Sequence, residues 1–436
     1  MKQDSISYKT IICDSNYRKL ILSGMIDRFG DSVDALAFTW LVYQITHNAM
    51  WSAIVFALNT LPNVIIQPFA GAVVERRNKK NVIIAAYILR ALVISIFAIL
   101  YSLGLVNAPI MAVLTLIITT IESFSLPASS AFTAQVVKKE HLTCGMSLSK
   151  MLTGAAALVG TGIAGVIIAA WGAVPAMIID ISTFIIAAVL ILLMKNPTHS
   201  NNEAENGATE IPETPVNAKG TESFGQLFSD GIKYVVKTPV VRNFCILCVA
   251  LNFMLVPINA LQAPIAEEIF KMGGELLSFA GVFASLGGIA GAAFLPMLSK
   301  KLSPLQTVCL GTGILGVGLA GIAMGGVISG KAILCYILVS ACFFTMVFSA
   351  TLIGGVIGIQ FMKSVESDYM ARSSAVFNAF ATAAMPLGSL LVSVLVSRIA
   401  TDKIILIGAL FAGIVLVLTL VTRPALGKRE EIVNAA

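Results

Sequence analysis

The sequence predicts an all-α integral membrane protein with about twelve transmembrane helices. Of its 436 residues, 57% are hydrophobic and only 12% are charged, whereas soluble globular proteins average about 25% charged residues. Apolar stretches of at least about 20 residues, each long enough to cross a bilayer as a helix, recur along nearly the whole chain. Alternating strands of about ten residues do not occur, which argues against an outer-membrane barrel. The expected spans are 20–45, 51–74, 81–104, 108–134, 146–170, 173–194, 240–266, 275–298, 305–328, 332–361, 372–398 and 403–422.

The loop charges predict the orientation in the membrane. Most lysines and arginines fall in loops on one side, and the opposite side holds only Lys271, Lys331, Arg398 and Lys403. Positively charged loops stay in the cytoplasm, so both termini are expected to be cytoplasmic and the number of spans even. The formal charge of +6 follows from this asymmetry, and nucleic-acid binding is not expected. Because the first 19 residues are polar, no cleavable signal peptide is expected before the first span.

One break in composition divides the chain into two halves. Residues 195–223 are rich in Asn, Glu, Pro and Thr, which predicts a flexible cytoplasmic linker. We therefore expect an N-terminal six-helix bundle over 1–194, an amphipathic helix and a second six-helix bundle over 224–422, and a cytoplasmic tail over 423–436. Equal halves of this kind favour a substrate site at their interface near mid-membrane. The apolar residues of the expected amphipathic helix are Phe224, Leu227, Phe228, Ile232 and Val235.

The first apolar stretch carries a stripe of charge. Asp27, Asp31 and Asp34 are spaced by four and three residues, which keeps the three carboxylates within about 60° of one another on a helix. A charged side chain near mid-bilayer costs roughly 2.5–3.5 kcal/mol, so a lipid-facing helix would not carry this stripe. The stripe must face the protein interior or a water-filled path. This makes it the first candidate for a functional site.

The carboxylates of this stripe suit proton-coupled transport. Neighbouring carboxylates in a low-dielectric site cannot all ionise cheaply, so at least one is expected to hold a proton. Arg28 is the expected counter-ion of Asp31 or of Asp27. The alternative is a buried network that only locks the first span to its neighbours. We assign Asp31 to that framework, and we take Asp34 and Asp27 as the residues with a coupling or substrate role.

Other polar residues lie inside the expected spans. Glu122 has either a proton or substrate role or a salt bridge to Arg90, and Asp180 is interpreted as structural. A further set of amides either lines a polar cavity or makes interhelical hydrogen bonds. These candidates are Asn59, Gln67, Asn252, Asn259, Gln262, Gln360 and Asn378.

The sequence predicts neither an enzyme nor a cofactor or metal site. Two G-x-G-x-x-G matches, at 160–165 and 311–316, lie inside apolar spans rather than after a strand, so they do not indicate nucleotide binding. No G-x-x-x-x-G-K-[ST] loop occurs in the sequence. Cys245 and Cys248 form a CxxC pair, but a zinc site needs about four ligands and the three histidines fall in separate connections.

The loop between the second and third spans resembles the signature loop of the major facilitator superfamily. It reads Gly71-Ala-Val-Val-Glu75-Arg76-Arg77-Asn78-Lys79-Lys80, a glycine followed by an acid four residues on and then a basic run. The resemblance extends over nearly the whole chain. RKLILSGMIDRFGDSVDALAFTWLVYQIT looks like the first span of the drug-efflux branch, and NFMLVPINALQAPIAEEIF is similar to the seventh span of macrolide exporters.

The resemblance implies a fold and a class of activity. It implies the major facilitator fold, in which two six-helix bundles alternate access to one small-molecule site, in a monomer of a bacterial cytoplasmic membrane. It also implies a cytoplasmic gate latch built from Gly71, Glu75, Arg76, Arg77 and Lys80, with Glu75 one methylene longer than the usual aspartate. The expected function is proton-coupled export of a small amphipathic compound such as a macrolide-like drug. The alternatives are a siderophore or metallophore exporter, a divalent-metal exporter, a lysophospholipid flippase and a non-transporting membrane sensor.

Overall fold

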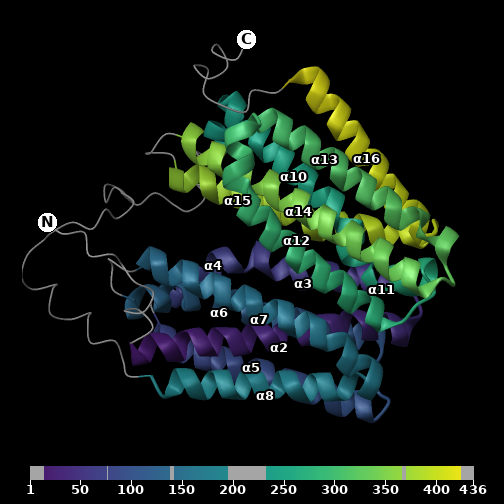
Figure 1. The fold of residues 1–436 in the computed structure, drawn as a ribbon. Helices are drawn as coiled ribbons and strands as arrows, with labels where there is room; N and C mark the ends of the chain where they lie inside the picture. Colours follow the sequence, from purple (N-terminus) through teal and green to yellow (C-terminus); the bar gives the residue numbers. More distant parts are fainter. Residues whose placement is uncertain (1–13, 76, 138–141, 195–231, 366–369, 424–436) are drawn as a thin grey trace, which may run out of the picture. The chain divides into compact units, whose positions relative to one another are not determined.

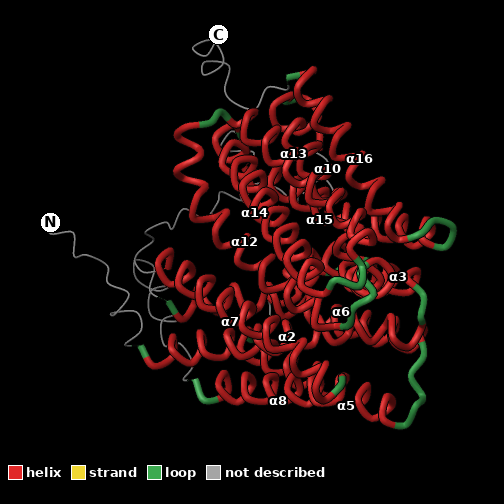
Figure 2. The backbone as a smooth tube through the Cα atoms, turned by 45° about the vertical axis from the view of Figure 1, so that its right-hand side comes forward, coloured by secondary structure: helices red, strands yellow, loops and turns green. Residues whose placement is uncertain are grey.

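Helices make up every regular element in the described part of the chain (Figures 1 and 2). The structure is a computed structural model that describes residues 14–75, 77–137, 142–194, 232–365 and 370–423. The expected linker and most of the expected amphipathic helix lie outside these residues, although 232–237 are helical. The first half contains α2 (Ser15–Thr46), α3 (Ala49–Ile65), α4 (Gln67–Glu75), α5 (Lys79–Ser102), α6 (Ala108–Val136), α7 (Leu142–Trp171) and α8 (Ala173–Leu192). The second half contains α10 (Pro239–Ala260), α11 (Gln262–Pro264), the π-helix η2 (Ile265–Ile269), α12 (Gly274–Lys301), α13 (Pro304–Ala323), the 3₁₀ helix η3 (Met324–Ile328), α14 (Ala332–Ser364), α15 (Met370–Val396) and α16 (Thr401–Thr422).

The predicted all-α membrane fold is confirmed. Nine helices in the described part of the chain are long and apolar enough to cross a membrane. The helix α2 is not among them because four charged residues interrupt its apolar stretch, and the second apolar stretch is divided between α3 and α4. The count of twelve spans stays a prediction.

The second expected span, 51–74, is not one continuous helix. The helix α3 ends at Ile65, and α4 starts at Gln67. Proline lacks a backbone N–H, so Pro62 and Pro68 each leave a carbonyl of the preceding turn without its helical donor. On α6, Thr119 donates to the carbonyl of Leu58, the acceptor that Pro62 leaves free, over 3.4 Å. Two prolines six residues apart therefore interrupt this span at its middle.

The chain divides into two compact units. The first comprises residues 1–208 together with Gly273–Val282, and the second comprises 209–272 with 283–436. In the first unit, α2 packs against both α7 and α8, and α5 packs against both α6 and α8 (Figure 1). In the second unit, α13 packs against α14 and α16, and α10 packs against α15 and α16. The predicted domain boundaries remain predictions, because the expected linker lies outside the described residues.

The helix α5 has one apolar face in the core and another at the surface. Ile83, Ile94 and Phe97 are buried in the core of the first unit. On the opposite face, Ile88 and Leu92 are 55% and 56% exposed. Extended apolar surfaces are rare on soluble monomers. The exposed face is therefore the surface expected to contact lipid.

A glycine sets the distance between α2 and α8. A Cβ atom added to Gly30 would clash with the hydroxyl of Thr183 and would come within 2.6 Å of the Asp180 Oδ1 atom. The contact brings the middle of α2 against α8, where Asp180 and Thr183 are buried. This close approach positions the charged residues of α2 beside those of α5 and α8.

Candidate functional site

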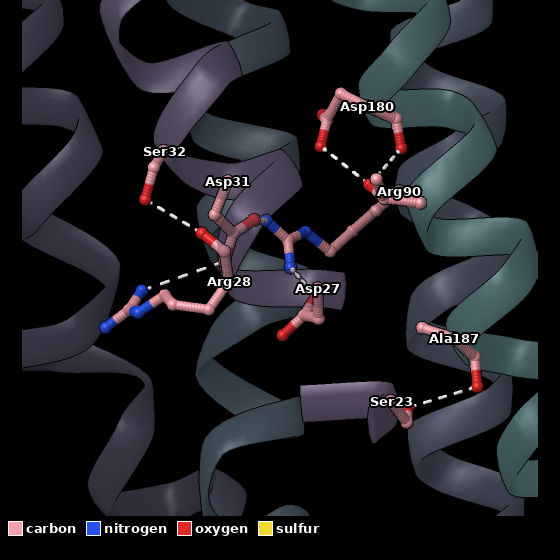
Figure 3. Close-up of polar contacts among 9 residues, drawn as sticks. Ser23, Asp27, Arg28, Asp31, Ser32, Arg90, Asp180 and Ala187 are labelled. Atoms are coloured by element: carbon pink, nitrogen blue, oxygen red, sulfur yellow. Dashed lines mark hydrogen bonds and ion pairs between the residues drawn. The ribbon is translucent and has the colours of Figure 1, made fainter. Parts of the chain in front are cut away.

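The charged stripe of α2 faces an arginine that comes from α5. The Arg90 Nη2 atom donates to the Asp31 Oδ1 atom over 2.5 Å, and its Nη1 atom lies 3.6 Å from the Asp27 Oδ1 atom. Figure 3 shows the Arg90 side chain reaching both aspartates. The Arg90 side chain is only 8% exposed, against 22% for Asp27 and 15% for Asp31. A buried cation thus lies between two carboxylates that are one helical turn apart.

An aromatic ring on α8 lies against the Arg90 side chain. The Arg90 guanidinium carbon lies 4.2 Å from the centre of the Phe184 ring, a cation–π contact. Tyr87 also stacks on this ring, at 6.2 Å between ring centres and a 27° interplanar angle. Phe184 itself is fully buried. The guanidinium therefore has an aromatic face on one side and carboxylates at its edge.

Arg28 forms the predicted ion pair with Asp31, but it is not the main counter-ion of the stripe. Its nearest guanidinium nitrogen lies 3.7 Å from the Asp31 Oδ2 atom, and its side chain is 55% exposed. Arg28 follows Asp27 directly, and adjacent residues on a helix point in different directions. The buried partner is Arg90 of α5, 59 residues after Asp31 in the sequence.

Asp34 and Glu122 have no ion pair or hydrogen bond within the described residues. The salt bridge between Glu122 and Arg90 that the sequence left open is not formed, because the two ion pairs of Arg90 are with Asp27 and Asp31. Both acids still act electrostatically on the group of charges around Arg90. They are therefore partly buried acids without a neutralising partner.

Asp180 lies deep in the helix packing. It is 0% exposed, and its Oδ1 atom accepts from the Thr183 hydroxyl over a long 3.4 Å. Its Oδ2 atom has no hydrogen-bond partner among the described residues. The packing against Gly30 suits the predicted structural role, and the lack of a cation adds one more uncompensated acid near Arg90.

The residues of the expected gate latch have different surroundings. The space beside Gly71 is open within 4 Å, and Arg77 is exposed. Lys80 instead holds the end of α8, because its Nζ atom donates to the carbonyls of Leu192 and Met194 over 3.0 and 2.6 Å. Arg76 and the side chain of Glu75 lie outside the described residues. The latch role of this set stays a prediction.

We expect Lys80→Gln to lower the stability of the protein by about 1 kcal/mol, because a cation at a helix C-terminus is lost together with its hydrogen bonds. The melting temperature of the purified protein measures this effect, with the exposed Arg77→Gln as the matched control. Transport per folded molecule should stay unchanged. A variant that melts normally but transports at an altered rate would instead support the latch role.

One family profile matches most of the chain. The profile of the Major Facilitator Superfamily covers residues 20–389, which include most of both halves. The chain belongs to the Major Facilitator Superfamily. It is therefore a multi-pass membrane transporter of small molecules, and its bacterial relatives indicate the cell membrane.

Relatives of this superfamily member are named for drug efflux or for staphyloferrin A transport, at low identity. The chain is 23% identical over 288 residues to the multidrug efflux pump Tap of Mycolicibacterium fortuitum, over 64% of this chain and 66% of that protein. It is 21% identical over 375 residues to macrolide efflux protein A of Streptococcus pyogenes, over 84% of this chain and 86% of that protein. It is also 21% identical over 287 residues to the staphyloferrin A transporter of Staphylococcus aureus, over 65% and 67% of the two chains.

The solved structures agree with the superfamily fold. The crystal structure of the nucleoside transporter NupG, in its D323A form, has a TM-score of 0.73 and covers 94% of this chain and 99% of its own. At 11% sequence identity this likeness shows the fold alone. The expected major facilitator fold is thereby confirmed.

The cavity candidates of this superfamily member have mixed surroundings. Asn252 donates from its side chain to the carbonyl of Cys248 over 2.9 Å, which is a hydrogen bond within its own helix. Asn59 and Asn378 are exposed. Whether any of them contacts a substrate stays a prediction. The half-buried members of the set are Gln67, Asn252, Asn259, Gln262 and Gln360.

Sequence reasoning underestimated Arg90 and missed Phe184. Arg90 is the only charged residue between 81 and 104, and a lone arginine in an apolar span is a signal that an acid on another helix pairs with it. The partner cannot be read from this signal, because it depends on which faces of α2 and α5 meet. Phe184 carries no such signal, since an aromatic residue in an apolar span is ordinary.

Proposed function

We propose that the chain is a secondary transporter that exports a small amphipathic compound in exchange for protons, by alternating access. One observation carries the proposal. Five acids, on α2, α6 and α8, surround the buried Arg90, and Arg28 is the only other cation paired with any of them in the described residues. These acids are Asp27, Asp31, Asp34, Glu122 and Asp180.

The charge balance gives the chemical reason. Taking an ionised carboxylate out of water costs several kcal/mol unless a cation or hydrogen bonds compensate it. Two arginines cannot neutralise five carboxylates, so the remaining acids hold protons or attract a cationic substrate. A group of acids that exchanges protons for substrate is what a proton-coupled exporter requires. A non-transporting sensor has no need for uncompensated charge inside the membrane.

The relatives support export of a drug-like compound. Two of them are named for efflux of macrolides or of several drugs. A siderophore is the second candidate, because a further relative is named as a staphyloferrin A transporter. We also propose that the protein works as a monomer with both termini in the cytoplasm, and that Glu75, Arg76 and Arg77 latch its cytoplasmic side.

Transport in proteoliposomes with an imposed pH gradient tests this function. We expect addition of a transported compound, from a screen of erythromycin, ethidium and a siderophore, to drive proton movement through the wild-type protein. Asp34→Asn is expected to abolish proton movement while the protein stays folded, because an amide cannot carry the proton. The exposed Asp402→Asn is the matched control for the same chemical change.

Two results would contradict the proposal. Transport of a compound by the wild-type protein without any proton movement would exclude proton coupling. Normal transport against a gradient by Asp34→Asn would remove Asp34 from the coupling mechanism.

A further inference from the structure

The two aspartates beside Arg90 differ in the number of arginines that pair with them. Asp31 lies between two arginines, at 2.5 Å from Arg90 and 3.7 Å from Arg28. In the described part of the chain, Asp27 forms one ion pair, with Arg90 at 3.6 Å. If Arg90 moved to Asp27, Asp31 would keep a cation. If Arg90 stays on Asp31, Asp27 has no close partner.

Arg90 and Asp27 each have a buried polar atom without a hydrogen-bond partner in the described residues. The Oδ1 atom of Asp27 and the Nε atom of Arg90 are buried and have no hydrogen-bond partner in the described residues. An ionised carboxylate facing a guanidinium normally closes to about 2.7–2.9 Å. The 3.6 Å separation is longer than this, so no hydrogen bond is formed, and a small movement of Arg90 would form it.

We propose that Arg90 exchanges between Asp31 and Asp27 during the transport cycle. Asp27 carries a proton while Arg90 is paired with Asp31. Phe184 is a positioning residue for Arg90. When Asp27 releases its proton to water, the new carboxylate takes Arg90, and Asp31 keeps Arg28. Protonation of Asp27 returns Arg90 to Asp31. Each exchange binds and releases one proton at Asp27, and the charge on Arg90, Asp27 and Asp31 together changes by that proton alone.

Several charged or titratable groups face Arg90 from the neighbouring helices. Besides Asp27 and Asp31, the helix α2 contributes Asp34 and Arg28, α6 contributes Glu122, and α8 contributes Asp180. Tyr87 lies on α5 itself. Of these, only Asp27 and Asp31 form an ion pair with Arg90 in the described residues. The exchange therefore has two end points.

The Phe184 ring is placed to support both end points. The guanidinium carbon of Arg90 lies over the ring, 4.2 Å from its centre. It is fully buried and fixed by the stack with Tyr87. A cation–π contact has no single hydrogen-bond direction, so Arg90 keeps this contact while it changes partners.

Infrared difference spectroscopy of the full-length protein in lipid nanodiscs tests the exchange without any substrate. A pH jump should reveal the carbonyl stretch of a protonated acid in the wild-type protein, with one component missing from Asp27→Asn. In Asp31→Asn the same component should also be missing, because Arg90 then stays on Asp27. A pair that does not exchange predicts that removal of Asp31 leaves the Asp27 component in place.

If Asp31→Asn does not fold, Arg28→Gln provides a second test. Arg28 is exposed, so its replacement should leave the fold intact. Without Arg28, Asp31 depends on Arg90, so the Asp27 component should persist to higher pH than in the wild type. Arg18→Gln, an exposed arginine on the same helix, is the matched control. Identical spectra for Arg28→Gln and Arg18→Gln would overturn the exchange, and so would a full wild-type spectrum from Asp27→Asn.

The positioning role of Phe184 has its own matched pair. Phe184→Leu should shift the pH at which the Asp27 component disappears by about one unit, because the contact with Arg90 is lost. Phe97→Leu removes an equally buried ring, one that pairs with Phe38 instead of a cation, and should not shift it. Phe184→Tyr keeps the aromatic face and should restore the wild-type profile. Equal shifts in the two leucine variants would show that Phe184 acts only by packing.

This inference rests on the proposed proton coupling, and the two fail separately. If proteoliposomes show no proton movement but the infrared pattern holds, the exchange exists without coupling to transport. If protons move with substrate but Arg28→Gln and Asp31→Asn leave the Asp27 component unchanged, coupling is correct and the exchange is wrong.

Discussion

Replacement of Arg90 with glutamine is expected to destabilise the protein by about 3–5 kcal/mol, because the partly buried carboxylates beside it lose their buried cation. Arg90 is 8% exposed, pairs with Asp31 and contacts the Phe184 ring, so both an ion pair and a cation–π contact are lost. The free energy of unfolding in bicelles, or the melting temperature in detergent, measures the effect.

Removal of one of the two carboxylates that pair with Arg90 should restore part of this loss. Asp31→Asn in the Arg90→Gln background neutralises the carboxylate closest to position 90, so the double variant is expected to be more stable than Arg90→Gln alone. Arg18→Gln controls for loss of an exposed arginine, whose effect is usually within about 0.5 kcal/mol. A melting temperature for Arg90→Gln equal to that of Arg18→Gln would show that the ion pair does not stabilise the fold.

Gly30→Ala is expected to lower stability by about 1–3 kcal/mol, the usual cost of excess volume in a tightly packed interior. The new methyl group would clash with the Thr183 hydroxyl and approach the Asp180 Oδ1 atom to 2.6 Å. The helix α8 would have to move away from α2, and the fit of Arg90 between the two helices would be lost with it. Melting temperature and proton-driven transport should therefore fall together.

Gly24→Ala provides the matched control on the same helix. Its added methyl group would lie 3.6 Å from the nearest atom, in Thr153, which is an ordinary van der Waals contact. Alanine favours a helix over glycine, so this variant should be as stable as the wild type or more stable. If the two variants melt at the same temperature, the close approach at Gly30 is not what sets the spacing of α2 and α8.

The sequence predicts the helices because their signals are local. Composition and the lengths of the apolar stretches identify the membrane class. Each expected span coincides with one helix or with two or three consecutive helical elements. The split of the second span at Ile66 was not predicted, although Pro62 and Pro68 carry the signal for it. Proline disrupts the helical turn in which it lies, so the break between α3 and α4 could have been predicted from the sequence.

The charged site is a different case. The spacing of Asp27, Asp31 and Asp34 showed that these residues share one face of a helix, and the cost of charge in a membrane showed that this face is not in lipid. Their counter-ion was assigned to Arg28 because Arg28 is close in sequence. The structure assigns the shortest contact to Arg90, since helix packing, and not sequence distance, decides which side chains meet.

The sequence alone therefore determined the class of protein, the positions of its helices and the helix face that carries the acids. These properties depend on composition and on the 3.6-residue period of a single helix. Only the tertiary structure decided that Arg90 neutralises Asp31, that Phe184 supports Arg90 and that Asp27 and Asp180 keep unsatisfied oxygen atoms. The physical reason is that these contacts join α2, α5 and α8, and the close approach at Gly30 that aligns α2 with α8 depends on shape complementarity between residues about 150 positions apart.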